Sequence, residues 1–199
     1  MEEKNIKEEV EKLMQIKGEC RGTALKSDAA FILKEEGVEG LKKLEQKMAE
    51  LGYPIKYNNI NATNFFPIGL RGVQLLVLQQ FFGFNREKFR QLGRFQTKVS
   101  LIVKLFMRFF VSLEIVSNQA PKMWGKHYTV GSLEIPKIDK EKKEGLIILR
   151  DFSLHPLHCQ FLEGFFASII SMVVGVPVVC EERKCTFKGG DCHEFIGKW

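Results

Sequence analysis

Apolar residues recur at three- and four-residue steps through the first half of the chain, which is the pattern of helices that bury one face. The predicted helices cover residues 3–14, 27–37, 37–51, 67–82 and 86–116. Glycine or proline follows most of these segments, as expected where a helix ends. The first half therefore predicts a layer of helices.

The second half of the chain predicts two pairs of strands with one helix between them. β-Branched and aromatic residues mark the four strands, at residues 126–135, 145–152, 176–187 and 193–199. The helix is predicted at residues 157–174. We therefore expect an α+β fold, in which an N-terminal helical layer packs on a small antiparallel sheet with a further helix between the two strand pairs. No linker or repeat is visible, so residues 1–199 predict a single domain, with 1–19 as an N-terminal helical extension.

The charges are dispersed. The net charge is +6, yet basic and acidic residues alternate in mixed clusters such as residues 137–144, and no run of five basic residues occurs. A nucleic-acid partner is therefore not expected.

The sequence also predicts a cytoplasmic protein without an integral membrane segment. The N-terminus is acidic and amphipathic, unlike a secretory signal, so the five cysteines are expected to be reduced. The most apolar stretch, residues 161–180, is interrupted by Glu163 and broken at Gly175 and Pro177. A buried core helix explains it better than a membrane span.

Potential metal ligands are concentrated near the C-terminus. They are His155, His158, Cys159, Cys180, Glu181, Glu182, Cys185, Cys192 and His193. Cysteine, histidine and glutamate together suit a divalent transition metal such as zinc. A buried cysteine is also a common small apolar core residue. Since CxxC and HExxH spacings are absent, the pattern alone leaves both interpretations open.

The C-terminal segment resembles a known family. The residues that carry the resemblance are Gly164-Phe-Phe-Ala-Ser, Gly175-Val-Pro-Val, Glu182-Arg-Lys-Cys185, Gly189 and Glu194-Phe195. They are similar to the C-terminal signature of the 4-vinyl-reductase, or hydrocarbon-binding, domain. Residues 20–125 are more loosely similar to a myxobacterial-type family of unknown function. The resemblance implies a ligand-binding domain with the fold of haem nitric-oxide sensors and of Golgi transport (TRAPP-type) subunits.

The resemblance also implies a structural zinc site. Phenol-sensing relatives hold zinc through a helix Cys, a Glu, a Cys and a final Cys, which places the ligands here at Cys159, Glu182, Cys185 and His193. Histidine replaces the last cysteine at position 193, and the neighbouring Cys192 is the alternative fourth ligand. Four protein ligands close the metal's coordination shell, so the site is expected to be structural.

Ten of the 17 phenylalanines lie within residues 65–110, which suits either a filled core or an apolar cavity for an aromatic or acyl ligand. The predicted ligand contacts are Phe95, Val99, Phe106, Phe110, Trp124, His127, Tyr128 and Phe165. Haem is not expected, because no histidine precedes His127 and the tyrosine-serine-arginine motif of the haem sensors is missing.

The resulting functional prediction is a non-catalytic module that binds or senses a small hydrophobic molecule. Its output would pass through a homodimer, with residues 98–116 as one interface, or through a separate signalling partner. A scaffold subunit with a filled or lipid-blocked pocket is the alternative. A tetrapyrrole vinyl reductase is less favoured, because no redox-cofactor motif is visible.

Overall fold

The computed structural model describes residues 2–99 and 112–199. Their packing divides the chain into two compact units. The first unit contains Met1–Asn85 and His127–Thr129, and the second contains Arg86–Lys126 and Val130–Trp199.

The first unit is mainly helical. Its elements are α1 (Glu2–Met14), β1 (Glu19–Arg21), α2 (Gly22–Glu50), η1 (Tyr57–Asn59), β2 (Phe65–Pro67) and α3 (Ile68–Phe82). Gly37 interrupts α2 with a φ of 68°, at the point where the sequence predicts one helix to end and the next to begin. Gly83, in the left-handed conformation, ends α3 as predicted.

A charged pair lies in the core of this unit. Arg71 of α3 and Asp28 of α2 are both fully buried, and the distance from Arg71 Nη1 to Asp28 Oδ2 is 3.1 Å. Beside them the Tyr57 hydroxyl donates to Gln74 Oε1, and Gln74 Nε2 donates to the Leu25 carbonyl. The helical packing therefore encloses a polar cluster that the hydrophobic pattern of the sequence does not reveal.

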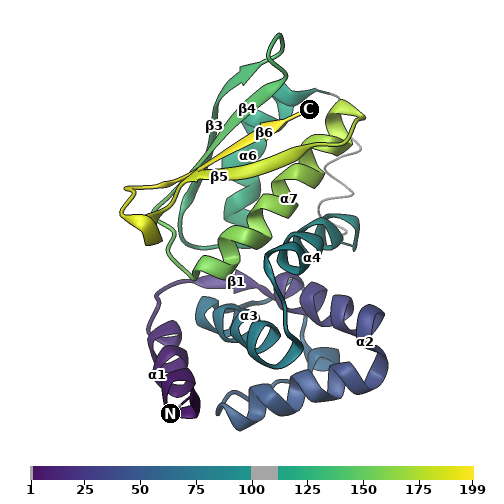
Figure 1. The fold of residues 1–199 in the computed structure, drawn as a ribbon, viewed down its shortest axis with the longest axis vertical. Helices are drawn as coiled ribbons and strands as arrows, with labels where there is room; N and C mark the ends of the chain where they lie inside the picture. The colour runs from purple at the N-terminus through teal and green to yellow at the C-terminus, as the bar shows by residue number, and fades with distance from the viewer. Residues whose placement is uncertain (1, 100–111) are drawn as a thin grey trace. The chain divides into compact units, whose positions relative to one another are not determined.

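The second unit combines helices with a four-stranded antiparallel sheet (Figure 1). Its elements are α4 (Arg86–Val99), α6 (Leu113–His127), β3 (Ser132–Asp139), β4 (Glu144–Arg150), α7 (Pro156–Val174), β5 (Val179–Lys184), η2 (Thr186–Lys188) and β6 (His193–Lys198). The strand order is β3-β4-β6-β5, so the two predicted strand pairs join through β4 and β6. Both α6 and α7 pack against one face of this sheet. The predicted α+β class is confirmed.

Helix α7 has the length and composition of a membrane-crossing helix, but 56% of that stretch is buried inside the protein.

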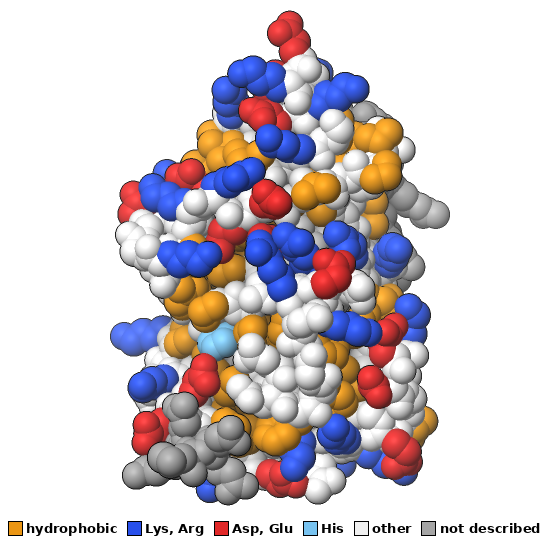
Figure 2. All heavy atoms as spheres, in the orientation of Figure 1, with side chains coloured by type: hydrophobic (Ala, Val, Ile, Leu, Met, Phe, Trp, Pro, Cys, Tyr) orange, Lys and Arg blue, Asp and Glu red, His pale blue; other side chains and the backbone are white. Residues whose placement is uncertain are grey.

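On the face drawn in Figure 2, Lys and Arg side chains lie among Asp and Glu side chains. This mixed surface matches the mixed charge clusters of the sequence.

The predicted strand at residues 126–135 was placed too early. Helix α6 continues to His127, and β3 begins at Ser132. Pro121 and Trp124 lie inside this helix, although both residue types favour a non-helical prediction from sequence. Tyr128, directly after the helix, forms an isolated antiparallel bridge with Cys20. The predicted helix at residues 86–116 is seen as α4 up to Val99, and residues 100–111 lie outside the described chain.

Two glycines bring α4 and α7 into backbone contact. A Cβ atom at Gly164 of α7 would lie 1.9 Å from the Arg90 carbonyl oxygen of α4, and one at Gly93 of α4 would lie 2.1 Å from the Phe161 carbonyl oxygen of α7. No side chain fits at either position, so the two helices pack at the closest distance that their backbones allow.

We therefore expect Gly164→Ala to lower the free energy of unfolding by about 1–3 kcal/mol, the cost typical of overpacking. Gly125→Ala is the matched control, because a Cβ there would meet no atom of residues 2–99 or 112–199 within 4 Å. The control should be neutral or slightly stabilising, since alanine favours a helix. Urea denaturation measures both changes, and equal effects of the two variants would contradict the packing argument.

Candidate metal centre

Four potential ligands converge in the second unit. Helix α7 supplies Cys159, β5 supplies Glu182, the residue after β5 is Cys185, and β6 begins with His193. One ligand atom from each residue lies within 4.8 Å of all the others. Cys159, Cys185 and His193 are buried and Glu182 is nearly so. These are the four residues named from the sequence.

The ring of His193 is held in one orientation. Its Nε2 lies 2.8 Å from the Phe152 carbonyl oxygen, which accepts a hydrogen bond, so Nε2 carries the proton. Thr186 Oγ1 contacts the same nitrogen at 2.9 Å. The other nitrogen, Nδ1, faces Glu182 Oε1 at 2.8 Å and Cys159 Sγ at 3.6 Å. A second proton or a metal ion at Nδ1 would satisfy this arrangement, and a backbone carbonyl behind the ring is typical of metal-ligating histidines.

The thiols lie in a setting that makes a bare thiolate unfavourable. Burial, together with Glu182 and Cys185, raises the pKa of Cys159 far above its usual range. Burial also raises the pKa of Cys185, although the backbone N–H of Phe187 acts in the opposite direction. A bound cation would reverse this preference, because it stabilises both thiolates.

The chemistry of these ligands fits zinc. Bonds of about 2.0–2.3 Å in a tetrahedral site place neighbouring ligand atoms roughly 3.3–3.8 Å apart. The spread of 4.8 Å would therefore contract modestly around an ion. With four protein ligands, such an ion would cross-link α7 to the β5–β6 hairpin and leave no position open for water.

The remaining potential ligands lie outside this group. Cys192, the alternative to His193, is buried, but its Sγ faces Glu194 Oε1 at 3.7 Å. Nδ1 of His155 caps the start of α7 by accepting from the Leu157 backbone N–H. His158 packs between the rings of Phe152 and Phe161.

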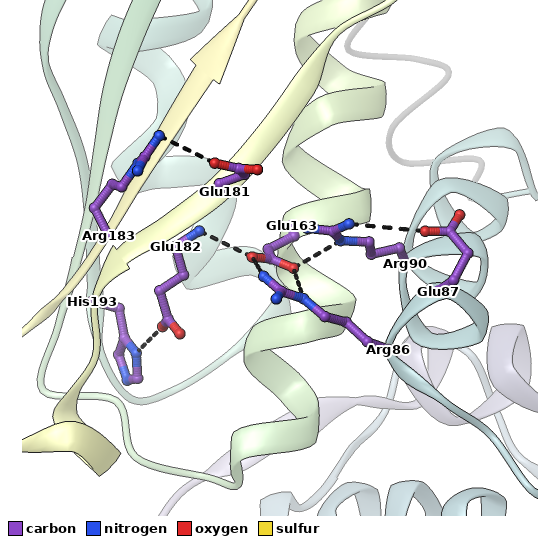
Figure 3. A network of polar contacts seen from close by, with 8 residues as sticks. All are labelled: Arg86, Glu87, Arg90, Glu163, Glu181, Glu182, Arg183 and His193. Carbon is purple, nitrogen blue, oxygen red and sulfur yellow. Dashed lines mark hydrogen bonds and ion pairs between the residues drawn. The ribbon is translucent and has the colours of Figure 1, made fainter.

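A network of charged groups borders the centre, and the sequence did not predict it (Figure 3). Glu163 of α7 pairs with Arg86 and Arg90 of α4 and accepts a hydrogen bond from the Glu182 backbone N–H. The one available signal was a glutamate inside an otherwise apolar helix.

The predicted ligand contacts fall in different parts of the chain. In the second unit Trp124 is buried and packs edge-on against Phe152, Phe95 and Phe165 are partly exposed, and Val99 is 40% exposed. In the first unit His127 and Tyr128 are buried. Phe106 and Phe110, and most of the predicted interface at 98–116, lie outside the described residues.

A small apolar recess lies between α6, α7 and the sheet. Its lining residues are Leu113, Val116, Ile135, Ile138, Gly145, Ile147, Ile170 and Trp199. Its volume of about 20 Å³ leaves room for roughly one water molecule. Among the predicted ligand contacts that the structure describes, none lines this recess.

Known structures identify the architecture. Over 89% of its length the chain matches an H-NOX protein from S. oneidensis in the Fe(II)NO state, with 98% of that chain covered, a TM-score of 0.68 and 10% identity. The chain has the H-NOX fold. The Fe(II) unliganded H-NOX protein from K. algicida matches over 89% of this chain and 95% of its own, with a TM-score of 0.64 and 10% identity. No protein-family model and no curated protein matches the sequence.

The H-NOX likeness corrects one prediction from the sequence. Haem was not expected, because the histidines come late in the chain, yet the solved structures with this fold include H-NOX proteins described in Fe(II) and Fe(II)NO states. The expectation against haem was wrong, because it rested on motif positions that do not carry over at 10% identity. The predicted sharing of the haem-sensor fold is confirmed, and the 4-vinyl-reductase and Golgi-subunit resemblances stay predictions.

Proposed function

We propose that this protein is a non-catalytic sensory module of the H-NOX fold that binds a small molecule and carries a structural zinc ion. The likeness to H-NOX proteins over nine-tenths of the chain is the observation that carries the proposal. The zinc ligands would be Cys159, Glu182, Cys185 and His193, the four groups that converge beside α7.

Haem is the first ligand to test. The chain offers a buried histidine, His127, next to a buried tyrosine, Tyr128, and both residue types serve as axial ligands of haem iron. Bound haem would supply an iron to which a diatomic gas coordinates, as in the NO-bound H-NOX structure. An aromatic or acyl molecule is the other class that the phenylalanine-rich sequence suits, with Phe95, Val99, Phe106, Phe110, Trp124 and Phe165 as proposed contacts.

We expect purified full-length protein to carry a co-purified small molecule in native mass spectrometry, or to bind added hemin with a Soret band. His127→Ala should shift or weaken that band, because the axial ligand sets the electronic state of the iron. His155→Asn is the control, since asparagine retains the N-terminal cap of α7. Protein that holds no small molecule and binds no hemin would contradict the sensory proposal.

A scaffold subunit is the second candidate function. The recess beneath α6 has room for about one water, as expected where a core is filled rather than open to a ligand. If this candidate is correct, the protein will contain no ligand but will associate stably with itself or another chain. Sedimentation at several concentrations measures self-association.

A further inference from the structure

Glu163 lies one helical turn after Cys159 on α7, and 2% of its side chain is exposed. Its Oε1 accepts from Arg86 Nη2 at 2.6 Å and from the Glu182 backbone N–H at 3.0 Å. Its Oε2 accepts from Arg86 Nε at 3.2 Å and from Arg90 Nε at 2.9 Å. Figure 3 shows the carboxylate pointing from α7 toward α4 and β5 at once.

These four hydrogen bonds keep the buried carboxylate ionised. Burial raises the pKa of Glu163, but bonds from Arg86, the Glu182 backbone and Arg90 more than offset it and hold the pKa below its usual value. An ionised group removed from water needs such partners. The carboxylate is therefore a fixed anchor and not a surface charge that changes partners freely.

The anchor acts on a residue of the metal centre. The Glu182 backbone N–H donates to Glu163, and the Glu182 side chain faces His193 Nδ1 at 2.8 Å. Cys159 and Glu163 are four positions apart, so they share one face of α7. The same face of one helix thus supplies a thiol to the centre and fixes the backbone of a second ligand.

We propose that Glu163 is a positioning residue that couples the seating of α4 to the metal affinity of the Cys159, Glu182, Cys185 and His193 centre. The inference rests on the metal centre proposed above. Arg86 and Arg90 hold the carboxylate, the carboxylate holds Glu182, and Glu182 binds the ion. Because coupling between two equilibria is reciprocal, zinc also stabilises α4 against α7.

The test is Glu163→Gln in the full-length protein, with zinc affinity measured by competition against a chromophoric chelator. Glutamine keeps the shape but loses the charge and one acceptor oxygen. We expect zinc affinity to fall by about 10- to 100-fold, the range for groups that orient metal ligands. Arg94→Gln is the matched control, because Arg94 is on α4 but pairs with the exposed Glu87. Zinc affinity of the control should equal that of the wild type.

A second variant, at an exposed residue, tests the same proposal in case Glu163→Gln does not fold. The Arg86 side chain is 58% exposed, so Arg86→Gln leaves the core intact and should weaken zinc binding by about tenfold. In protein that already carries Glu163→Gln, the same change should add little, because both act through one path. If Glu163 were only structural, the zinc-free protein would lose stability while zinc affinity stayed unchanged.

Two failures can be told apart. Wild-type protein without stoichiometric zinc would overturn both the metal centre and this inference. Wild-type protein that binds zinc, with Cys185→Ala abolishing binding and Glu163→Gln leaving it unchanged, would overturn the positioning role alone.

Discussion

Cys185→Ala should yield protein without stoichiometric zinc and with a much lower melting temperature. Cys185 lies just after β5, so removing its thiol would open the proposed zinc cross-link between the hairpin and α7. The loss of a structural metal corresponds to roughly 5 kcal/mol or more, which for a chain of this size lowers the melting temperature by about 10–20 °C. Elemental analysis and thermal denaturation measure the two effects.

Cys192→Ala is the matched control, because Cys192 is equally buried but its thiol faces Glu194. This variant should retain its zinc and most of its stability. Loss of zinc in Cys192→Ala, with zinc retained in Cys185→Ala, would show that the cluster is not the metal centre.

Arg71→Met should destabilise the first unit strongly, and more so at higher pH. Removing one member of a buried ion pair costs about 3–5 kcal/mol, because the remaining charge is left in the core. Burial already raises the pKa of Asp28 to about 6, with Arg71 acting against that rise. Without Arg71 the pKa of Asp28 rises further.

The raised pKa of Asp28 determines how the stability of the protein changes with pH. Asp28 has a pKa of about 6 when folded and an ordinary value of 3.8, so its stabilising contribution is complete below pH 4 and is lost as the pH rises through 6. In Arg71→Met the pKa of Asp28 is higher still, so stability continues to fall over a wider range of pH. The deficit relative to wild type should therefore be small at pH 5 and approach its full size at pH 8.

Urea denaturation at both pH values measures the deficit. The double variant Asp28→Leu, Arg71→Met is the control, since it removes both charges and should recover much of the stability. A deficit that is the same at pH 5 and pH 8 would show that Asp28 is not the group responsible.

Local signals were sufficient for much of the fold. Gly37 and Gly83 adopt the positive φ that ends or breaks a helix, and the sequence placed helix boundaries at both. A family resemblance also named the four residues that converge beside α7, because it supplied a register that spacing alone lacked. That these residues hold a metal stays a prediction. Each of these predictions depends on residues near one another in sequence or on a known pattern.

Other features depend on residues far apart in the sequence, and the sequence pattern does not reveal them. Arg86 and Glu163 are 77 positions apart, and nothing in the sequence pairs them. Asp28 and Arg71 look like ordinary polar positions of helices until α2 and α3 bury them together. The two-stranded ribbon of β1 and β2 was missed because each strand has three residues, too few for a periodic pattern.

The glycine contacts between α4 and α7 determine how a movement of one helix affects the other. At Gly93 and Gly164 the backbones of the two helices are in direct contact. No side chains lie between them there that could absorb a shift by changing rotamers. A tilt of α4 would therefore move α7 with it, as one rigid body. Amide hydrogens in the two helices should exchange with solvent together, as one cooperative unit.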